Sequence, residues 1–290
     1  LLLSIIILGA QGQSIDVLKE QLKNAGEQKK PSIENTISEA YFGLNKYKKA
    51  TEYAKQAINH AKNTGKTLEE LRGYINAGNA SKKHQKYDQA IDYFESSLAI
   101  AKSENKQDLA AYSYESIGYC LTSLKKFSRA IISYKKALAT MLKTGKEKAA
   151  IYAKIGYNNY ATSEFKEAIE YYEKANRLYN ISPDPDKHSK MLVNLGKVYA
   201  QYGDYDKAIS RLKTARTVAE KNGLDHAAKR VNGVIASIEK NKANKSEQLT
   251  GFDQDEIDQT EEYIHNIERA QVKSLKEIEN LSIKNQVKEL

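Results

Sequence analysis

One pattern of small and aromatic residues recurs five times along the 290 residues of this chain, at a nearly constant interval. A Gly or Ser stands twelve residues before a central alanine, and an aromatic residue stands three residues before it. The central alanines, which are 40, 40, 38 and 40 residues apart, are Ala50, Ala90, Ala130, Ala168 and Ala208. Self-similarity at such a period predicts a stack of equivalent supersecondary units, and it carries more weight than any local signal.

Each unit is predicted to consist of two amphipathic helices joined by a short polar turn, because apolar residues recur at helical spacing on both sides of the turn. A glycine inside a helix costs about 1 kcal/mol relative to alanine, so four glycines at one repeat position indicate a packing requirement. Small residues at helix crossings allow close approach. The predicted repeat-packing residues are Gly78, Ala90, Gly118, Ala130, Gly156, Ala168, Gly196 and Ala208.

The fifth unit contains Leu195-Gly196-x-x-Tyr199, then Tyr205-x-x-Ala208 and Leu212-x-x-Ala215, and the other four units carry close copies. This pattern resembles the tetratricopeptide repeat, in a variety whose period exceeds the usual 34 residues or so. It departs from the usual pattern at Glu34 and Leu192, where an aromatic residue is expected. The resemblance implies an all-α fold, a right-handed α-solenoid of stacked helix-turn-helix repeats over residues 32–240, with five repeats and a capping helix.

The ends of the chain have different characters. Residues 1–12 are an apolar run followed by small residues, which indicates part of a secretory signal peptide; the alternative is an apolar terminus that packs on the first repeat. Residues 13–31 are expected to form an N-terminal helix and residues 241–254 a polar linker. A long helix is expected over residues 255–290, and it is a possible coiled coil, although its heptads are irregular.

The net charge of +9 is unevenly distributed. Residues 251–290 contain ten acidic and five basic residues, a net charge of −5, which leaves +14 on the remainder. A basic solenoid favours anionic partners such as acidic peptides, phosphates, an anionic membrane surface or nucleic acid. The alternative interpretation is a lysine-rich surface that is simply solvated.

Nothing in the sequence indicates catalysis. The five histidines lie in different units without metal-ligand spacing, so we expect neither a metal nor another cofactor. The single cysteine, Cys120, is expected to be a small buried core residue. Asp184 and Asp186 lie in the longest loop between repeats, where they are expected to start a helix. Any catalytic domain would lie beyond residue 290.

We expect a binding groove on the concave surface of the solenoid, which the first helices of such repeats line. Asn amides pair with an extended peptide backbone, Lys and Arg bind carboxylates, and Tyr is enriched at binding hot spots. Tetratricopeptide domains that bind the acidic carboxyl end of a partner use a similar set of Asn and Lys residues. The predicted groove residues are Asn35, Arg72, Asn76, Asn79, Lys82, Tyr112, Tyr119, Lys154, Tyr157, Tyr160, Asn194 and Lys197.

The order of signal, repeats, linker and long helix resembles the extracytoplasmic sensor part of bacterial signalling proteins such as histidine kinases. This resemblance implies an exported protein or peptide binder, periplasmic or on the cell surface, and anchored in the membrane if the chain continues past residue 290. The alternative is a free-standing adaptor that forms homodimers through residues 255–290. A third function, nucleic-acid binding, agrees with the charge but conflicts with export.

Overall fold

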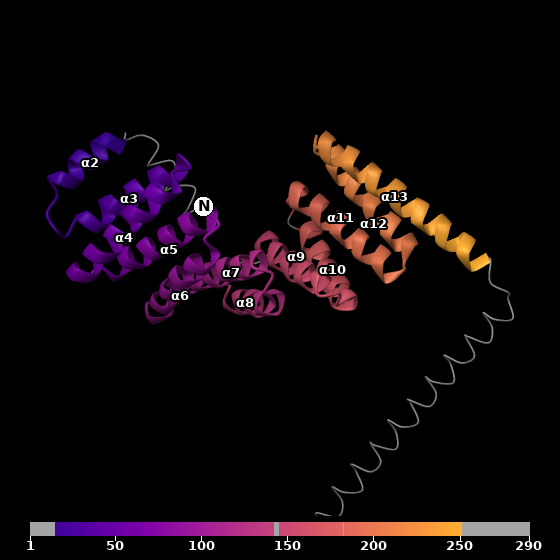
Figure 1. Cartoon of the computed structure of the whole chain (residues 1–290), viewed down its shortest axis with the longest axis horizontal. Helices are drawn as coiled ribbons and strands as arrows, with labels where there is room; N and C mark the ends of the chain where they lie inside the picture. Colours follow the sequence, from indigo (N-terminus) through magenta and orange to yellow (C-terminus); the bar gives the residue numbers. More distant parts are fainter. Residues whose placement is uncertain (1–14, 142–144, 182, 251–290) are drawn as a thin grey trace, which may run out of the picture. The chain divides into compact units, whose positions relative to one another are not determined.

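The computed structural model describes residues 15–141, 145–181 and 183–250. Within these ranges every regular element is an α-helix, twelve in all (Figure 1). The chain divides into two compact units, Leu1–Gly233 and Val234–Leu290, and the division falls within the last described helix. The predicted signal segment 1–12 and the predicted long helix 255–290 lie outside the described residues.

Five helical hairpins form the body of the first unit. Their first helices are α3 (Lys30–Gly43), α5 (Thr67–Lys83), α7 (Gln107–Ser123), α9 (Lys146–Ala161) and α11 (Pro185–Tyr202). Their second helices are α4 (Tyr47–Thr64), α6 (Tyr87–Ser103), α8 (Phe127–Thr140), α10 (Phe165–Ile181) and α12 (Tyr205–Lys221). Helix α2 (Ile15–Lys23) precedes the hairpins and α13 (Asp225–Thr250) follows them.

Each helix from α2 to α11 packs on the next one along the chain, and α3 also contacts α5. The central alanines of all five units are buried, with no exposed surface. Because each hairpin contacts its neighbours in sequence order, the prediction of an all-α stack of helix-turn-helix units is confirmed.

The repeated glycines make room for one large side chain of their own hairpin. A Cβ atom on Gly78 would lie 2.8 Å from Cε1 of Phe94, and one on Gly156 would lie 3.0 Å from the ring of Tyr172. Gly196 is close to backbone as well, since its Cβ atom would lie 3.1 Å from the carbonyl oxygen of Ala208. The glycine position therefore serves mainly to accommodate a ring, and backbone approach is the lesser part of its role.

The first hairpin has a serine where the others have glycine. Ser38 is buried, and its hydroxyl group donates a hydrogen bond of 2.7 Å to the carbonyl oxygen of Ala50 on α4. The side chain sixteen residues further on is the small Ala54, which leaves space for the serine. A hydrogen bond thus replaces the glycine–ring contact in this unit.

Every turn inside a hairpin contains a residue with positive φ. These residues are Asn45, Gln85, Lys125, Ser163 and Gly203, with φ values of 57, 60, 57, 65 and 95°. Left-handed backbone costs little for glycine and more for residues with a Cβ atom. The five turns therefore share one backbone geometry, and only the fifth hairpin has a glycine at the position with positive φ.

Residues 241–250 were expected to belong to a linker, but they are the last part of α13. The segment contains no Gly or Pro, and its Lys, Ala, Glu and Gln residues favour helix. The side chains of its first five residues are exposed, so the polar composition of this segment is that of a solvated helix. No described helix is both long enough and apolar enough to cross a membrane.

Cys120 on α7 is buried, as predicted, and has no exposed surface. Burial raises the pKa of its thiol group to about 11. A thiol with such a pKa remains protonated near neutral pH and is a poor nucleophile. Cys120 is therefore a packing residue.

Candidate functional site

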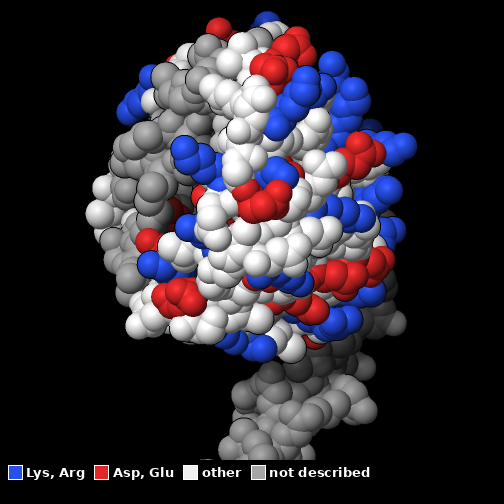
Figure 2. Space-filling model, turned by 90° about the vertical axis from the view of Figure 1, so that its left-hand side faces the viewer, with Lys and Arg blue, Asp and Glu red and all other residues white. Residues whose placement is uncertain are grey.

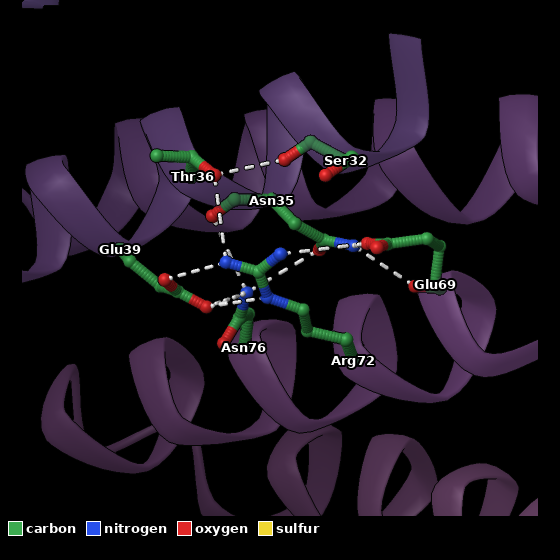
Figure 3. A network of polar contacts seen from close by, with 7 residues as sticks. All are labelled: Ser32, Asn35, Thr36, Glu39, Glu69, Arg72 and Asn76. Carbon is green, nitrogen blue, oxygen red and sulfur yellow. Dashed lines mark hydrogen bonds and ion pairs between the residues drawn. The ribbon is translucent and has the colours of Figure 1, made fainter. Parts of the chain in front are cut away.

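Seven residues of α3 and α5 form one polar network between the first two hairpins (Figure 3). Its members are Ser32, Asn35, Thr36, Glu39, Glu69, Arg72 and Asn76. Arg72 donates through Nε and Nη2 to the two carboxylate oxygens of Glu39, both at 2.8 Å. Asn35 donates through Nδ2 to Oε2 and to the backbone oxygen of Glu69, at 2.8 and 2.9 Å. Asn76 donates to Glu39 at 3.2 Å.

The charges within this network compensate one another. Burial alone would lower the pKa of Arg72, but Glu39 and Glu69 outweigh it and raise that pKa. Nη1 of Arg72 lies 3.6 Å from Glu69, so one guanidinium group is shared by two carboxylates. This network joins the first two hairpins, and its donors are already used within the protein.

Asn35 was predicted to line the binding groove, and this prediction is wrong. Its side chain is fully buried, and its amide donates to Glu69 while its oxygen accepts from Asn76. The packing of α3 on α5 covers it. Arg72 and Asn76 remain half-buried, but the network occupies their donors.

Lys82 on α5 lies in an aromatic environment that we call the lysine cage, formed by Phe94, Tyr112, Ser116 and Tyr119. The ammonium nitrogen is 5.2 Å from the ring centre of Phe94 and 5.7 Å from those of Tyr112 and Tyr119. Its polar contact is the Ser116 hydroxyl group at 3.5 Å. Among the described residues, no carboxylate forms an ion pair with Lys82.

The lysine cage is a low-polarity site. Burial lowers the pKa of Lys82, since water no longer solvates the ammonium group fully. Burial also raises the pKa of Tyr112, whose hydroxyl group donates to Oδ1 of Asn79 at 2.6 Å. Buried charges are normally paired, so a half-buried lysine without an acid partner among the described residues is unusual.

A second set of contacts joins α7 to α9. Lys154 forms an ion pair with Glu115, and the hydroxyl group of Thr122 donates to Oδ1 of Asn158 at 2.9 Å. Lys154 was a predicted groove residue, but its ammonium group is already paired with Glu115. Tyr160, another predicted groove residue, packs against Phe165 with ring centres 6.0 Å apart.

Three predicted residues are exposed on successive first helices. Tyr119 on α7 and Tyr157 on α9 each retain 45% of their surface, and Lys197 on α11 is exposed. Asn194, the remaining predicted residue, lies beside the buried hydroxyl group of Tyr172. The exposed residues therefore extend over α7, α9 and α11, while the α3–α5 end is closed by the polar network.

Sequence reasoning missed the acidic members of this surface. Glu39 stands at the same repeat position as Asn79, forty residues earlier, and Glu115 stands eighty residues after Asn35. A search of every unit at these positions, for acids as well as for bases and amides, would have found both. Their charges explain why several predicted ligand-binding residues are already paired.

Two hollows on the surface of the described residues lie elsewhere. One runs along α12 and is lined by residues between Asp206 and Thr217, and the other lies between α2 and α3. Neither includes a predicted groove residue. In the described part of the chain, no group of three or more His, Cys, Asp or Glu residues could hold a metal ion.

Several solved structures share this fold. BtubC from P. vanneervenii has a TM-score of 0.63 at 20% identity, over 76% of this chain and 92% of that one. The quorum sensor NprR from B. thuringiensis, in its apo form, has a TM-score of 0.61 at 16% identity, over 75% of this chain and 62% of that one. A signal transduction ATPase with a tetratricopeptide repeat sensor, from Pyrococcus horikoshii, has a TM-score of 0.71 at 17% identity, over 87% of this chain but 39% of that one.

No curated protein sequence matches the chain. The family described as Tetratricopeptide repeat matches residues 69–143 and 147–221, which together make up more than half of the chain. The matched segments contain four of the five hairpins and all four repeated glycines. The chain therefore belongs to the tetratricopeptide repeat family.

Proposed function

We propose that this chain acts by binding, without catalysis, and that its ligand is a protein or peptide with an acidic group. Tetratricopeptide repeats generally bind protein or peptide partners. The observation that carries the proposal is the lysine cage: Lys82 is half-buried among three aromatic rings and has no acid partner among the described residues. A ligand carboxylate would supply the missing charge, and Asn79 and Ser116 lie nearby to orient it.

The test is the affinity of the full chain for two synthetic peptides that differ only in their acids. One peptide carries aspartates and the other carries asparagines at the same positions. We expect the acidic peptide to bind at least tenfold more tightly, and Lys82→Gln to remove most of this difference. Lys55→Gln, which removes an exposed lysine of α4, is the matched control and should change nothing. Equal affinities for both peptides would refute an acidic ligand.

We further propose that the chain is the exported sensor or interaction region of a bacterial membrane signalling protein. Its support is the order of segments in the sequence, together with a solved relative in which such repeats form the sensor of a larger signalling protein. Reading the gene past the codon for Leu290 tests this directly. A membrane span followed by an output domain is expected; a stop codon would favour a free-standing periplasmic or surface adaptor.

The adaptor alternative includes dimerisation through residues 255–290. Light scattering during size-exclusion chromatography would compare residues 13–290 with a chain that ends at Lys240. A dimer that becomes a monomer on truncation is the expected result for the adaptor. Equal monomeric masses would reject dimerisation through this segment.

Nucleic-acid binding is a third candidate, favoured only by the net charge of +14 outside residues 251–290. On the face in Figure 2, acidic side chains are interspersed among the lysines and arginines, whereas a phosphate backbone favours a continuous basic stripe. Filter binding at two salt concentrations tests it. Binding that weakens steeply with salt would support this candidate, and no measurable binding would eliminate it.

A further inference from the structure

The turns inside the first three hairpins carry a concentration of basic residues. The eight-residue segments that end at the central alanines, 43–50, 83–90 and 123–130, together contain eight Lys or Arg and one Asp, a net charge of +7 with His counted as neutral. The equivalent segments of the fourth and fifth hairpins, 161–168 and 201–208, contain two basic and four acidic residues, a net charge of −2. We call the first three segments the basic edge.

The segments of the basic edge lie next to one another, and their charges face solvent. Nζ of Lys126 in the third turn lies 3.4 Å from Oδ1 of Asp88 in the second. Near the first turn, Ala50 packs in one cluster with Ala80, which lies close to the end of α5 that leads into the second turn. All eight basic side chains are exposed, and within the described part of the chain the pair Lys126–Asp88 is the one ion pair that any of them forms.

The fold does not require these charges. Lys46, Lys86 and Lys126 stand at the N-caps of α4, α6 and α8, but a lysine side chain has no acceptor with which to cap a helix, and none of the three does so. The same repeat position holds Glu164 and Asp204 in the fourth and fifth hairpins, and Asp204 does cap its helix. Since the same turn is built with an acid or with a base, the lysines of the basic edge are available for another role.

We propose that the basic edge binds the surface of an anionic phospholipid membrane through the phosphates of the lipid headgroups. Its bases are exposed side chains at turns, and the hollows on α12 and between α2 and α3 are lined by other residues. A charged membrane needs no pocket, because each lysine close to it strengthens binding by about fivefold. Leu44, which is 56% exposed in the first turn, is placed to enter the headgroup region. This role goes beyond the proposed peptide binding, which uses Lys82 and not the basic edge.

The aromatic residues of the basic edge favour lipid over single-stranded nucleic acid as the partner. Proteins that bind single strands stack the bases on exposed aromatic rings. Tyr47, Tyr87 and Phe127 begin α4, α6 and α8, but all three are half-buried in the hairpins. The charge also ends with the third hairpin, so we expect the first three hairpins to contact the membrane and the fourth and fifth to make no electrostatic contribution.

The test is co-sedimentation of the full chain with phosphatidylcholine vesicles, with and without about one-third phosphatidylglycerol. We expect at least tenfold tighter binding to the anionic vesicles, and a preference that weakens as salt is added. The double variant Lys46→Glu with Lys86→Glu should lose most of the preference. Its fold should persist, because Glu164 occupies the same position in the fourth hairpin, and circular dichroism checks this.

The matched control is the double variant Lys66→Glu with Lys106→Glu. These lysines are also exposed N-cap residues, of α5 and α7, at the turns between hairpins, and their replacement changes the net charge by the same amount. The segments around them, 63–70 and 103–110, each have a net charge of −1, so this variant should keep the preference. The apolar residues 1–12 are the same in every variant and with both kinds of vesicle, so the difference reports the charge.

Three results would overturn the proposal. The first is equal binding to neutral and anionic vesicles by the parent chain. The second is an equal loss of preference in the two double variants, which would show that net charge matters and the basic edge does not. The third is tighter binding of a labelled DNA duplex than of anionic vesicles at the same salt concentration, lost in Lys46→Glu with Lys86→Glu, which would assign the basic edge to nucleic acid.

Discussion

The ring of Tyr134 occupies the space that a side chain at Gly118 would need. A Cβ atom on residue 118 would lie 2.7 Å from Cε1 of Tyr134, and both residues are buried. We therefore expect Gly118→Ala to lower the free energy of unfolding by about 1–3 kcal/mol, as overpacking of a core does. Urea denaturation followed by circular dichroism measures the change.

Gly233 on α13 provides the control for this substitution. No atom lies within 4 Å of the position that its Cβ atom would take, so Gly233→Ala should stabilise the helix by about 0.5–1 kcal/mol. A destabilisation of similar size at both positions would contradict the assignment of a packing role to Gly118.

The turn between α7 and α8 contains a lysine in left-handed backbone conformation. Lys125 has φ 57° and an exposed side chain, so Lys125→Gly should relieve strain without removing a described contact. We expect a stabilisation of about 1 kcal/mol. Gly203 has φ 95° at the equivalent turn, so Gly203→Ala should destabilise the protein. Thermal denaturation of the two variants beside the parent checks both signs.

The pairing of Arg72 with Glu39 should contribute to the coupling of the first two hairpins. Both side chains are largely buried, at 26 and 18% exposure, and two hydrogen bonds of 2.8 Å join them. A double-mutant cycle with Arg72→Met and Glu39→Gln should give a coupling energy of about 1.5–3 kcal/mol. The exposed pair Lys126–Asp88, at 3.4 Å, should give about 0–1 kcal/mol in the same assay. Equal coupling in the two pairs would contradict the importance of burial.

The stability of the chain should decrease in mild acid because of His188. Burial lowers the pKa of this imidazole below its usual 6.5, and the ring stacks on Tyr179 while Nε2 lies 2.8 Å from Oδ1 of Asn176. The unfolded chain then binds a proton more readily than the folded chain, so the contribution of His188 is complete above about pH 6.5 and declines as pH falls toward the folded pKa.

Urea midpoints at several pH values between about 7 and 5 measure this effect. Burial raises the pKa of Glu34, which acts in the opposite sense, so the informative quantity is the difference between the parent and His188→Gln. That difference should decrease as the pH falls. A constant difference across the range would show that His188 does not titrate there.

The sequence predicts the local part of this structure well, for a physical reason. The helices, the hairpins and the burial of Cys120 follow from periodicity and residue size, which act within one repeat. The sequence also indicates that the glycines have a packing role, but only the structure shows that Gly78 faces the ring of Phe94.

The polar contacts between repeats could not be predicted in the same way. The burial of Asn35 depends on Glu69, which is 34 residues away and on another hairpin. Side chains so far apart meet only through the relative placement of two hairpins, and periodicity gives no information about it. The linker prediction failed at residues 241–250 for a related reason, because polar residues compose solvated helices as readily as loops, as they do at 241–245.

In each of the four units that have the repeated glycine, sixteen residues separate the glycine from the large side chain that fills its space, as in Gly78–Phe94 and Gly196–Leu212. Because these contacts join residues that are close in sequence, a hairpin can form with little loss of loop entropy before its neighbours are in place. A duplication or deletion of about forty residues would add or remove a hairpin with its internal packing intact.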